Sequence, residues 1–185
     1  MTDKTNCSER LDDNNFVVLR ELVPHKEAVD LAEGFLKYCI MNGIKGDVQA
    51  PNSPSVYDYK PFLKLMLRLL PTLNELLNKE LFPTYCYARV YSKGEILERH
   101  RDREACEHSV TLNLFKGKDW PIWMQSPDES EHSVELNPGD GILYKGCEAD
   151  HWREAYKGDI HIQLFMHYVD SEGPNSWAYF DKRKG

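Results

Sequence analysis

The stretch SVTLNL at residues 109–114 alternates polar and aliphatic side chains one by one, and HIQLFMH at residues 161–167 largely repeats the alternation. A period of two places successive side chains on opposite faces of a β-strand. Each stretch therefore predicts a strand with one aliphatic face and one polar face. We expect such strands in a sheet that is covered on both sides, with the polar faces lining a pocket.

The rest of the chain divides into a helical first part and a second part rich in strands. Helical spacing of apolar residues predicts a helix over 25–39 and another over 58–81, which Pro71 would kink or split. Further short strands are expected at 16–19, 87–91, 96–100, 120–125, 133–136 and 141–144. Two helices followed by seven or eight short strands indicate a mainly β fold with some α structure. We predict a double-stranded β-helix core, which is a jelly-roll or cupin-like core, with N-terminal buttressing helices.

The length of 185 residues suits one domain. Residues 1–15 are polar and are interpreted as a flexible N-terminal lead. Residues 16–185 are expected to form a single domain, with helices within 25–81 and the jelly-roll core within 83–168.

Composition narrows the partners and the compartment. The chain has 23 Lys plus Arg against 30 Asp plus Glu, a net charge of −7, which disfavours nucleic acid as a partner. No apolar run is long enough to span a membrane. Five cysteines without a CxxC pair indicate reduced thiols rather than a disulfide framework. A cytoplasmic location is therefore expected.

One constellation of side chains can carry chemistry. His100-Arg101-Asp102 follows an expected turn, and His151 follows the turn and strand at 137–144. Two histidines and one carboxylate form the facial triad of non-haem Fe(II) oxygenases, which leaves three coordination positions open. An HxD pair alone arises easily by chance. Its position at the mouth of an expected barrel, matched by a distant His, gives it weight.

The segment from Tyr91 through His100-x-Asp102, the strand at 109–114, the turn at 137–140 and His151 together resemble the Fe(II)/2-oxoglutarate-dependent oxygenase superfamily. The prolyl-4-hydroxylase-like branch is the most similar, and the resemblance covers residues 85–168. It implies a dioxygenase that uses Fe(II), 2-oxoglutarate and O₂ and hydroxylates a C–H bond. The implied substrate is a prolyl or other residue of a peptide or protein, or a small amino-acid-like metabolite.

The resemblance assigns His100, Asp102 and His151 as metal ligands and as the catalytic centre. It assigns Tyr91 as a contact of the co-substrate, and Asn113 is a further candidate on the polar face of the next strand.

The sequence departs from the family at the residue that holds the far carboxylate of 2-oxoglutarate. The branch usually carries Lys or Arg nine or ten residues after the distal His, where this chain has Ile160 and His161. A protonated His161 is one candidate for this role. Arg89 and Arg153 are the others, because an arginine offers a permanently charged, bidentate partner.

Three other residues near the motif have competing interpretations. His167 could replace His151 as the distal ligand, and His151 is preferred because it follows the expected turn. Cys106 and Cys147 are interpreted as bystanders, because a zinc site would usually have closely spaced cysteines.

The absence of the usual Lys or Arg leaves a second functional class open. A cupin-like metal- or ligand-binding module without 2-oxoglutarate turnover could use the same triad. Binding of the co-substrate distinguishes the two classes.

Overall fold

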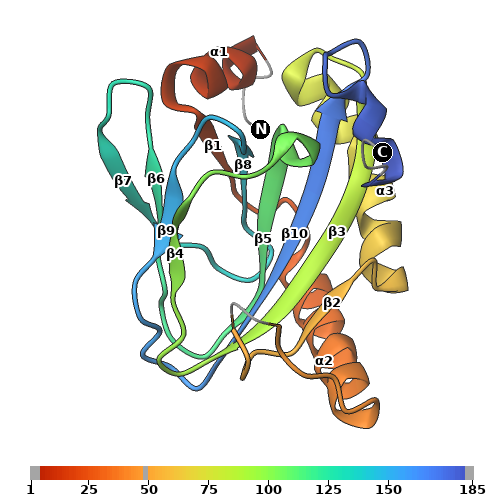
Figure 1. The fold of residues 1–185 in the computed structure, drawn as a ribbon, viewed down its shortest axis with the longest axis vertical. Helices are drawn as coiled ribbons and strands as arrows, with labels where there is room; N and C mark the ends of the chain where they lie inside the picture. The colour runs from red at the N-terminus through yellow and green to blue at the C-terminus, as the bar shows by residue number, and fades with distance from the viewer. Residues whose placement is uncertain (1–4, 48–49, 182–185) are drawn as a thin grey trace.

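The computed structural model describes residues 5–47 and 50–181, and it consists of two antiparallel sheets with helices against the larger one (Figure 1). The six-stranded sheet has the order β1-β8-β5-β10-β3-β2. Its strands are β1 (Phe16–Leu19), β2 (Ser55–Tyr57), β3 (Leu81–Ser92), β5 (His108–Lys116), β8 (Gly141–Lys145) and β10 (Ile160–Asp170). The four-stranded sheet has the order β4-β9-β6-β7, and its strands are β4 (Leu97–His100), β6 (Ile122–Gln125), β7 (Glu131–Val134) and β9 (His151–Arg153). This arrangement confirms the predicted mainly β, jelly-roll fold.

The helices are α1 (Thr5–Asn14), α2 (His25–Met41) and α3 (Lys60–Leu77), with short 3₁₀ segments η1 (Glu104–Cys106) and η2 (Ser176–Asp181). The apolar stripes of α2 and α3 pack against the aliphatic faces of β3, β5 and β10, where Leu112 and Leu164 are fully buried. The helices therefore buttress the large sheet as predicted, and its opposite face is left for the site.

Three local expectations are corrected. Residues 1–15 are not all a flexible lead, because residues 5–14 form α1, and the helix buries Cys7 and Leu11 in the main core; residues 1–4 lie outside the described residues. Pro71 does not split α3, since buried residues on both sides of it anchor one continuous helix and Pro71 itself is exposed. The helix ends at Leu77 rather than at 81, because Asn78 adopts a left-handed conformation that stops it.

Two strands were not predicted. Strand β2 lies in a segment that reads as a loop, and β9 has only three residues, so neither carries a detectable alternation. Strand β2 forms because it pairs with β3, and strand β9 forms because it pairs with β4 and β6. No helix in the described part of the chain is long and apolar enough to cross a membrane.

The register of β10 sets the layout of the site. Strand β10 lies between β3 and β5, with His161 opposite Tyr91, and with Gln163 opposite both Arg89 and Asn113. Four of the five residues expected to contact the co-substrate therefore lie on three neighbouring strands, and the fifth, Arg153, lies on β9.

Candidate active site

His100, Asp102 and His151 converge at paired ends of two strands of the small sheet and in the turn that follows β4. His100 is the last residue of β4 and pairs with His151, the first residue of β9, while Asp102 lies two residues beyond β4. The Nε2 atoms of His100 and His151 lie 3.6 and 3.7 Å from the same oxygen, Oδ1 of Asp102. Each residue offers one ligand atom, and these three atoms all lie within 4.8 Å of one another, so they can bind the same cation. This spacing suits coordination of one divalent metal.

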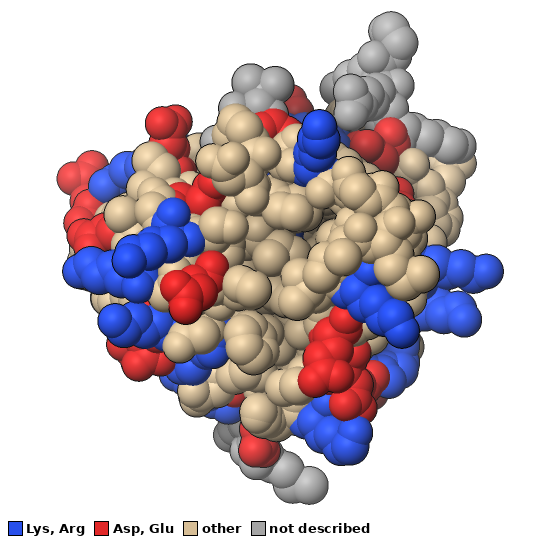
Figure 2. All heavy atoms as spheres, turned by 90° about the horizontal axis from the view of Figure 1, so that it is seen from below, with Lys and Arg blue, Asp and Glu red and all other residues tan. Residues whose placement is uncertain are grey.

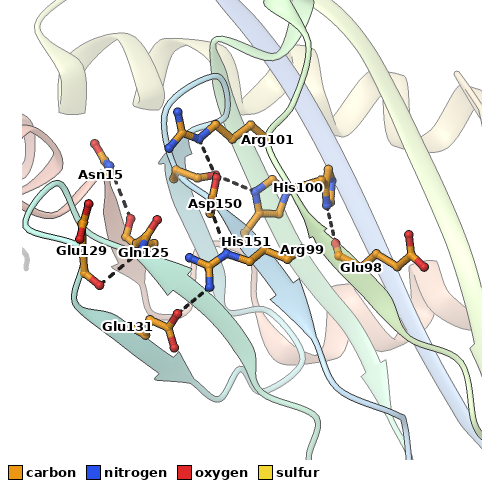
Figure 3. A network of polar contacts seen from close by, with 11 residues as sticks. Asn15, Glu98, Arg99, His100, Arg101, Gln125, Glu129, Glu131, Asp150 and His151 are labelled. Atoms are coloured by element: carbon orange, nitrogen blue, oxygen red, sulfur yellow. Dashed lines mark hydrogen bonds and ion pairs between the residues drawn. The ribbon is translucent and has the colours of Figure 1, made fainter.

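Both imidazoles are held in the tautomer that a metal needs. His100 Nδ1 donates to the carbonyl of Glu98 at 2.7 Å, and His151 Nδ1 donates to the carbonyl of Ala149 at 3.0 Å (Figure 3). A carbonyl can only accept, so Nδ1 carries the proton in each neutral ring and the lone pair is on Nε2. Such outer hydrogen bonds typically orient metal-binding histidines.

The three side chains also influence one another's charge. Burial disfavours the Asp102 anion, but a hydrogen bond from protonated His100 and the charges of the neighbouring histidines outweigh it and lower the pKa of Asp102 to about 2. The same hydrogen bond, which only the protonated ring can donate, raises the pKa of His100, whereas burial lowers the pKa of His151. At neutral pH Asp102 is therefore an anion, as a metal ligand must be.

The second oxygen of Asp102 has its own partners. Tyr144 donates its hydroxyl to Oδ2 at 3.2 Å, and Ser109 approaches the same oxygen at 3.3 Å. Both partners are buried, Tyr144 on β8 and Ser109 on β5. Sequence reasoning missed Tyr144, although the strand at 141–144 was predicted directly before His151 and a buried tyrosine in a strand near a metal motif could have signalled it.

A pocket of about 310 Å³ opens beside the triad. Arg89 and Tyr91, two of the residues expected to contact the co-substrate, line it together with the triad. Arg89 is buried, forms an ion pair with Asp47 and donates to the Tyr87 hydroxyl. Its charge is therefore already balanced by a carboxylate.

Arg153, Asn113 and His161 are buried and do not line this pocket. Arg153 and His151 lie two residues apart on β9, and both are buried. Arg153 donates to the carbonyl of Trp120 and, at 3.4 Å, to Gln163 Oε1. Within residues 5–47 and 50–181 no carboxylate forms an ion pair with Arg153, and burial lowers its pKa to about 10. Among these residues, Arg153 is therefore a buried cation that has no anionic partner.

His161, one of the three candidates for the cation, is the least suited to that role in this arrangement. Burial and the charge of Arg153 lower the pKa of His161 to about 3, which favours the neutral ring. Its Nε2 donates to Gln163 Oε1 at 2.9 Å. Its Nδ1 and the side-chain oxygen of Asn113 are buried and have no partner among the described residues, so this deep region has unmet capacity for hydrogen bonds.

A polar network borders the triad on the side of the small sheet (Figure 3). Asp150 accepts from Arg99 at 3.0 Å and from Arg101 at 2.6 Å, and Arg99 also pairs with Glu131 at 2.6 Å. These hydrogen bonds from Arg101 and Arg99 lower the pKa of Asp150. The network links β4, β7 and the residue before His151, and so fixes the two strands that carry the histidines.

Charge is mixed at the surface seen in Figure 2. Basic and acidic side chains lie beside each other at the margins, and uncharged residues occupy much of the centre. This face offers no continuous basic surface for phosphates, in agreement with the net charge of −7.

The fold is a jelly-roll, and comparisons with known proteins show which solved structures share it. No protein-family model and no curated protein matches the sequence. Many solved structures share the fold, and three of them are described next.

A prolyl-4-hydroxylase from Pseudomonas putida has a TM-score of 0.73 at 16% identity, over 91% of this chain and 99% of that chain. An oxidoreductase of the 2OG-Fe(II) oxygenase family from Burkholderia pseudomallei has a TM-score of 0.72 at 12% identity, over 94% and 93%. The epimerase SnoN, in complex with Fe³⁺, alpha-ketoglutarate and nogalamycin RO, has a TM-score of 0.73 at 13% identity, over 98% and 90%. At these identities the likeness establishes the fold, which agrees with the resemblance in the sequence.

Proposed function

We propose that this protein is an Fe(II)- and 2-oxoglutarate-dependent dioxygenase that hydroxylates a C–H bond and releases succinate and CO₂. The observation that carries the proposal is the convergence of two Nε2 atoms on one oxygen of Asp102, with both Nδ1 atoms held by backbone carbonyls. Fe(II) held by His100, Asp102 and His151 would supply the oxidising chemistry, with open positions for the keto acid and O₂.

Arg153 is our choice for the residue that binds the far carboxylate of 2-oxoglutarate. Arg153 lies two residues beyond His151 on β9, which at the rise of a β-strand is about 7 Å. This distance is comparable with the length of a five-carbon diacid. The described residues offer Arg153 no anionic partner, which supports this role, because a buried cation is stabilised by a paired anion. Arg89 is less suitable, since Asp47 already neutralises it.

Tyr91 and Asn113 would complete the co-substrate pocket. Tyr91 is almost fully buried and lines the pocket. Burial raises the pKa of its hydroxyl, and the nearby charges of Arg89 and Arg153 oppose this rise only in part. Its hydroxyl therefore stays protonated and can donate to a carboxylate. Asn113, beside Gln163, would orient the deep end.

The outer wall of the pocket suits a substrate with an apolar ring or chain. Tyr57, Tyr85, Tyr87 and Phe165 line it, and the Tyr57 and Tyr87 rings lie 4.6 Å apart. We propose a prolyl or other residue of a peptide or protein, or a small amino-acid-like metabolite, as the substrate class. The described cysteines are all free thiols, which supports a reducing, cytoplasmic location.

Anaerobic titration of the Fe(II)-loaded protein with 2-oxoglutarate tests the proposal. Chelation of the keto acid gives a visible metal-to-ligand charge-transfer band, which should saturate in the wild type and disappear in His100→Ala. Iron binding without the band would favour the cupin-like binding module instead. Absence of iron binding would refute the triad itself.

A further inference from the structure

A second group of metal-ligating side chains lies on the far side of Asp102. Asp102, Cys106 and His167 each offer one ligand atom, and these atoms all lie within 4.8 Å of one another. The residues come from the turn after β4, from η1 and from β10. All three line the pocket, so the space between them is reachable from it.

The two oxygens of Asp102 face different neighbours. Oδ1 faces the Nε2 atoms of His100 and His151. Oδ2 lies 3.3 Å from the Ser109 hydroxyl, which is also 2.8 Å from His167 Nδ1. One carboxylate can therefore serve both groups, with one oxygen for each.

Serine and tyrosine side chains hold the second group in place. The Ser109 hydroxyl also contacts the carbonyl of Cys106 at 3.0 Å, so it touches all three residues. The Tyr85 hydroxyl lies 3.1 Å from Cys106 Sγ, and its ring centroid lies 4.5 Å from that of His167. Cys106 and His167 are 2% and 5% exposed, so their positions are fixed by packing.

We propose that Asp102, Cys106 and His167 form a second metal site, for a thiophilic divalent cation of the Zn²⁺ class. A thiolate, an imidazole and a carboxylate are the donors that such a cation prefers, and three protein ligands leave one position for water. On binding, the Cys106 thiol releases its proton to solvent and the sulfur–metal bond forms, with no change of oxidation state. This proposal gives Cys106 a role that the sequence-based interpretation, which took it as a bystander, did not.

The second site would oppose the first through the shared carboxylate. A cation on Oδ2 withdraws negative charge from Asp102 and weakens its bond to a metal on Oδ1, and the effect is reciprocal. This consequence, unlike the site itself, rests on the proposed function. Zinc would then lower the affinity of the triad for Fe(II), and the effect would depend on Cys106.

Titration of the metal-free, reduced protein with Co²⁺ tests the site. A thiolate bound to Co²⁺ gives a near-ultraviolet charge-transfer band, which His and Asp ligands do not give. We expect a saturable band in the wild type and its loss in Cys106→Ser. Cys147→Ser is the matched control, because Cys147 is a half-buried thiol near Arg103 that is outside the cluster. The band should persist in that variant.

Two further variants separate this proposal from the proposed function. His100→Ala disables the triad but leaves the second group, so it should keep the band while bound Co²⁺ falls from two per chain to one. Tyr85→Phe preserves the shape and removes the contact to sulfur, so it should weaken the cobalt affinity that the band reports by about 10- to 100-fold. Cobalt binding to the wild type without the band, or a band that survives in Cys106→Ser, would overturn the second site.

Discussion

Replacing Arg153 by Met should selectively destroy recognition of the far carboxylate of 2-oxoglutarate. The side chain is 3% exposed, so water cannot take the place of the lost guanidinium. Removing one partner of a buried, hydrogen-bonded charge pair costs about 2–5 kcal/mol. Because 1.4 kcal/mol is tenfold in affinity, the Kd should rise about 30- to 4,000-fold.

The assay compares two keto acids under anaerobic conditions. 2-Oxoglutarate and 2-oxopentanoate have the same keto-acid end, but the second carries a methyl group in place of the far carboxylate. The wild type should bind 2-oxoglutarate far more tightly, as judged by the charge-transfer band. Arg153→Met should bind both with similar, weak affinity. Equal weakening of both ligands, with discrimination preserved, would refute the assignment of Arg153.

Arg89→Met is the matched control. Asp47 already pairs with Arg89, so this substitution should change the ratio of the two affinities by less than about tenfold. A collapse of discrimination in Arg89→Met, with Arg153→Met unaffected, would transfer the role to Arg89.

The stability of Arg153→Met without ligand provides an independent check. Burial lowers the pKa of Arg153 well below its usual value, to about 10, so the folded state binds its proton less tightly than the unfolded state does. The penalty is present in full below about pH 10 and is relieved as the pH rises from there toward the pKa of the unfolded state. The gap corresponds to roughly 3 kcal/mol, partly offset by the hydrogen bonds of Arg153. Urea unfolding at pH 7 should therefore show an equal or higher free energy of unfolding, and a large loss would show that Arg153 is structural.

Three further predictions concern the triad and the core. Tyr144→Phe removes the hydrogen bond to Oδ2 of Asp102 and should weaken Fe(II) binding by about 10- to 100-fold, measured by competition with a chelator; an unchanged affinity would contradict the role of Tyr144. Metal affinity should fall as the pH is lowered through the raised pKa of His100, because a metal binds only the neutral imidazole. Asp102 does not contribute to this fall, since its carboxyl stays ionised down to about pH 2. A metal affinity that stays constant in titrations between pH 5 and 8 would refute this prediction. Phe35→Ala should lower the free energy of unfolding by about 3–5 kcal/mol in urea, because Phe35 is fully buried between α2, α3 and the large sheet; a loss below about 1 kcal/mol would show that the site can collapse.

Much of the fold could be predicted because period-two alternation is a local signal. The stretches at 109–114 and 161–167 lie within β5 and β10, and the faces that they predicted are the ones observed. The boundaries of α3 and the helix at Thr5–Asn14 could not be predicted, because they depend on one left-handed residue and on burial of two side chains in a distant core. Strand β9 exists only through its pairing partners.

The sequence by itself determined the donor set of the candidate site, because residue type and placement after turns are enough to propose His100, Asp102 and His151. Only the tertiary structure gives a reason to prefer Arg153 over Arg89 and His161 as the proposed cation. The pKa, the counter-ion and the burial of each candidate depend on residues that are far away in the chain. Arg89 pairs with Asp47, and Arg153 donates to the carbonyl of Trp120. For the same reason the grouping of Asp102 with Cys106 and His167 could not be read from sequence spacing. It depends on the position of β10 beside η1, which long-range packing sets.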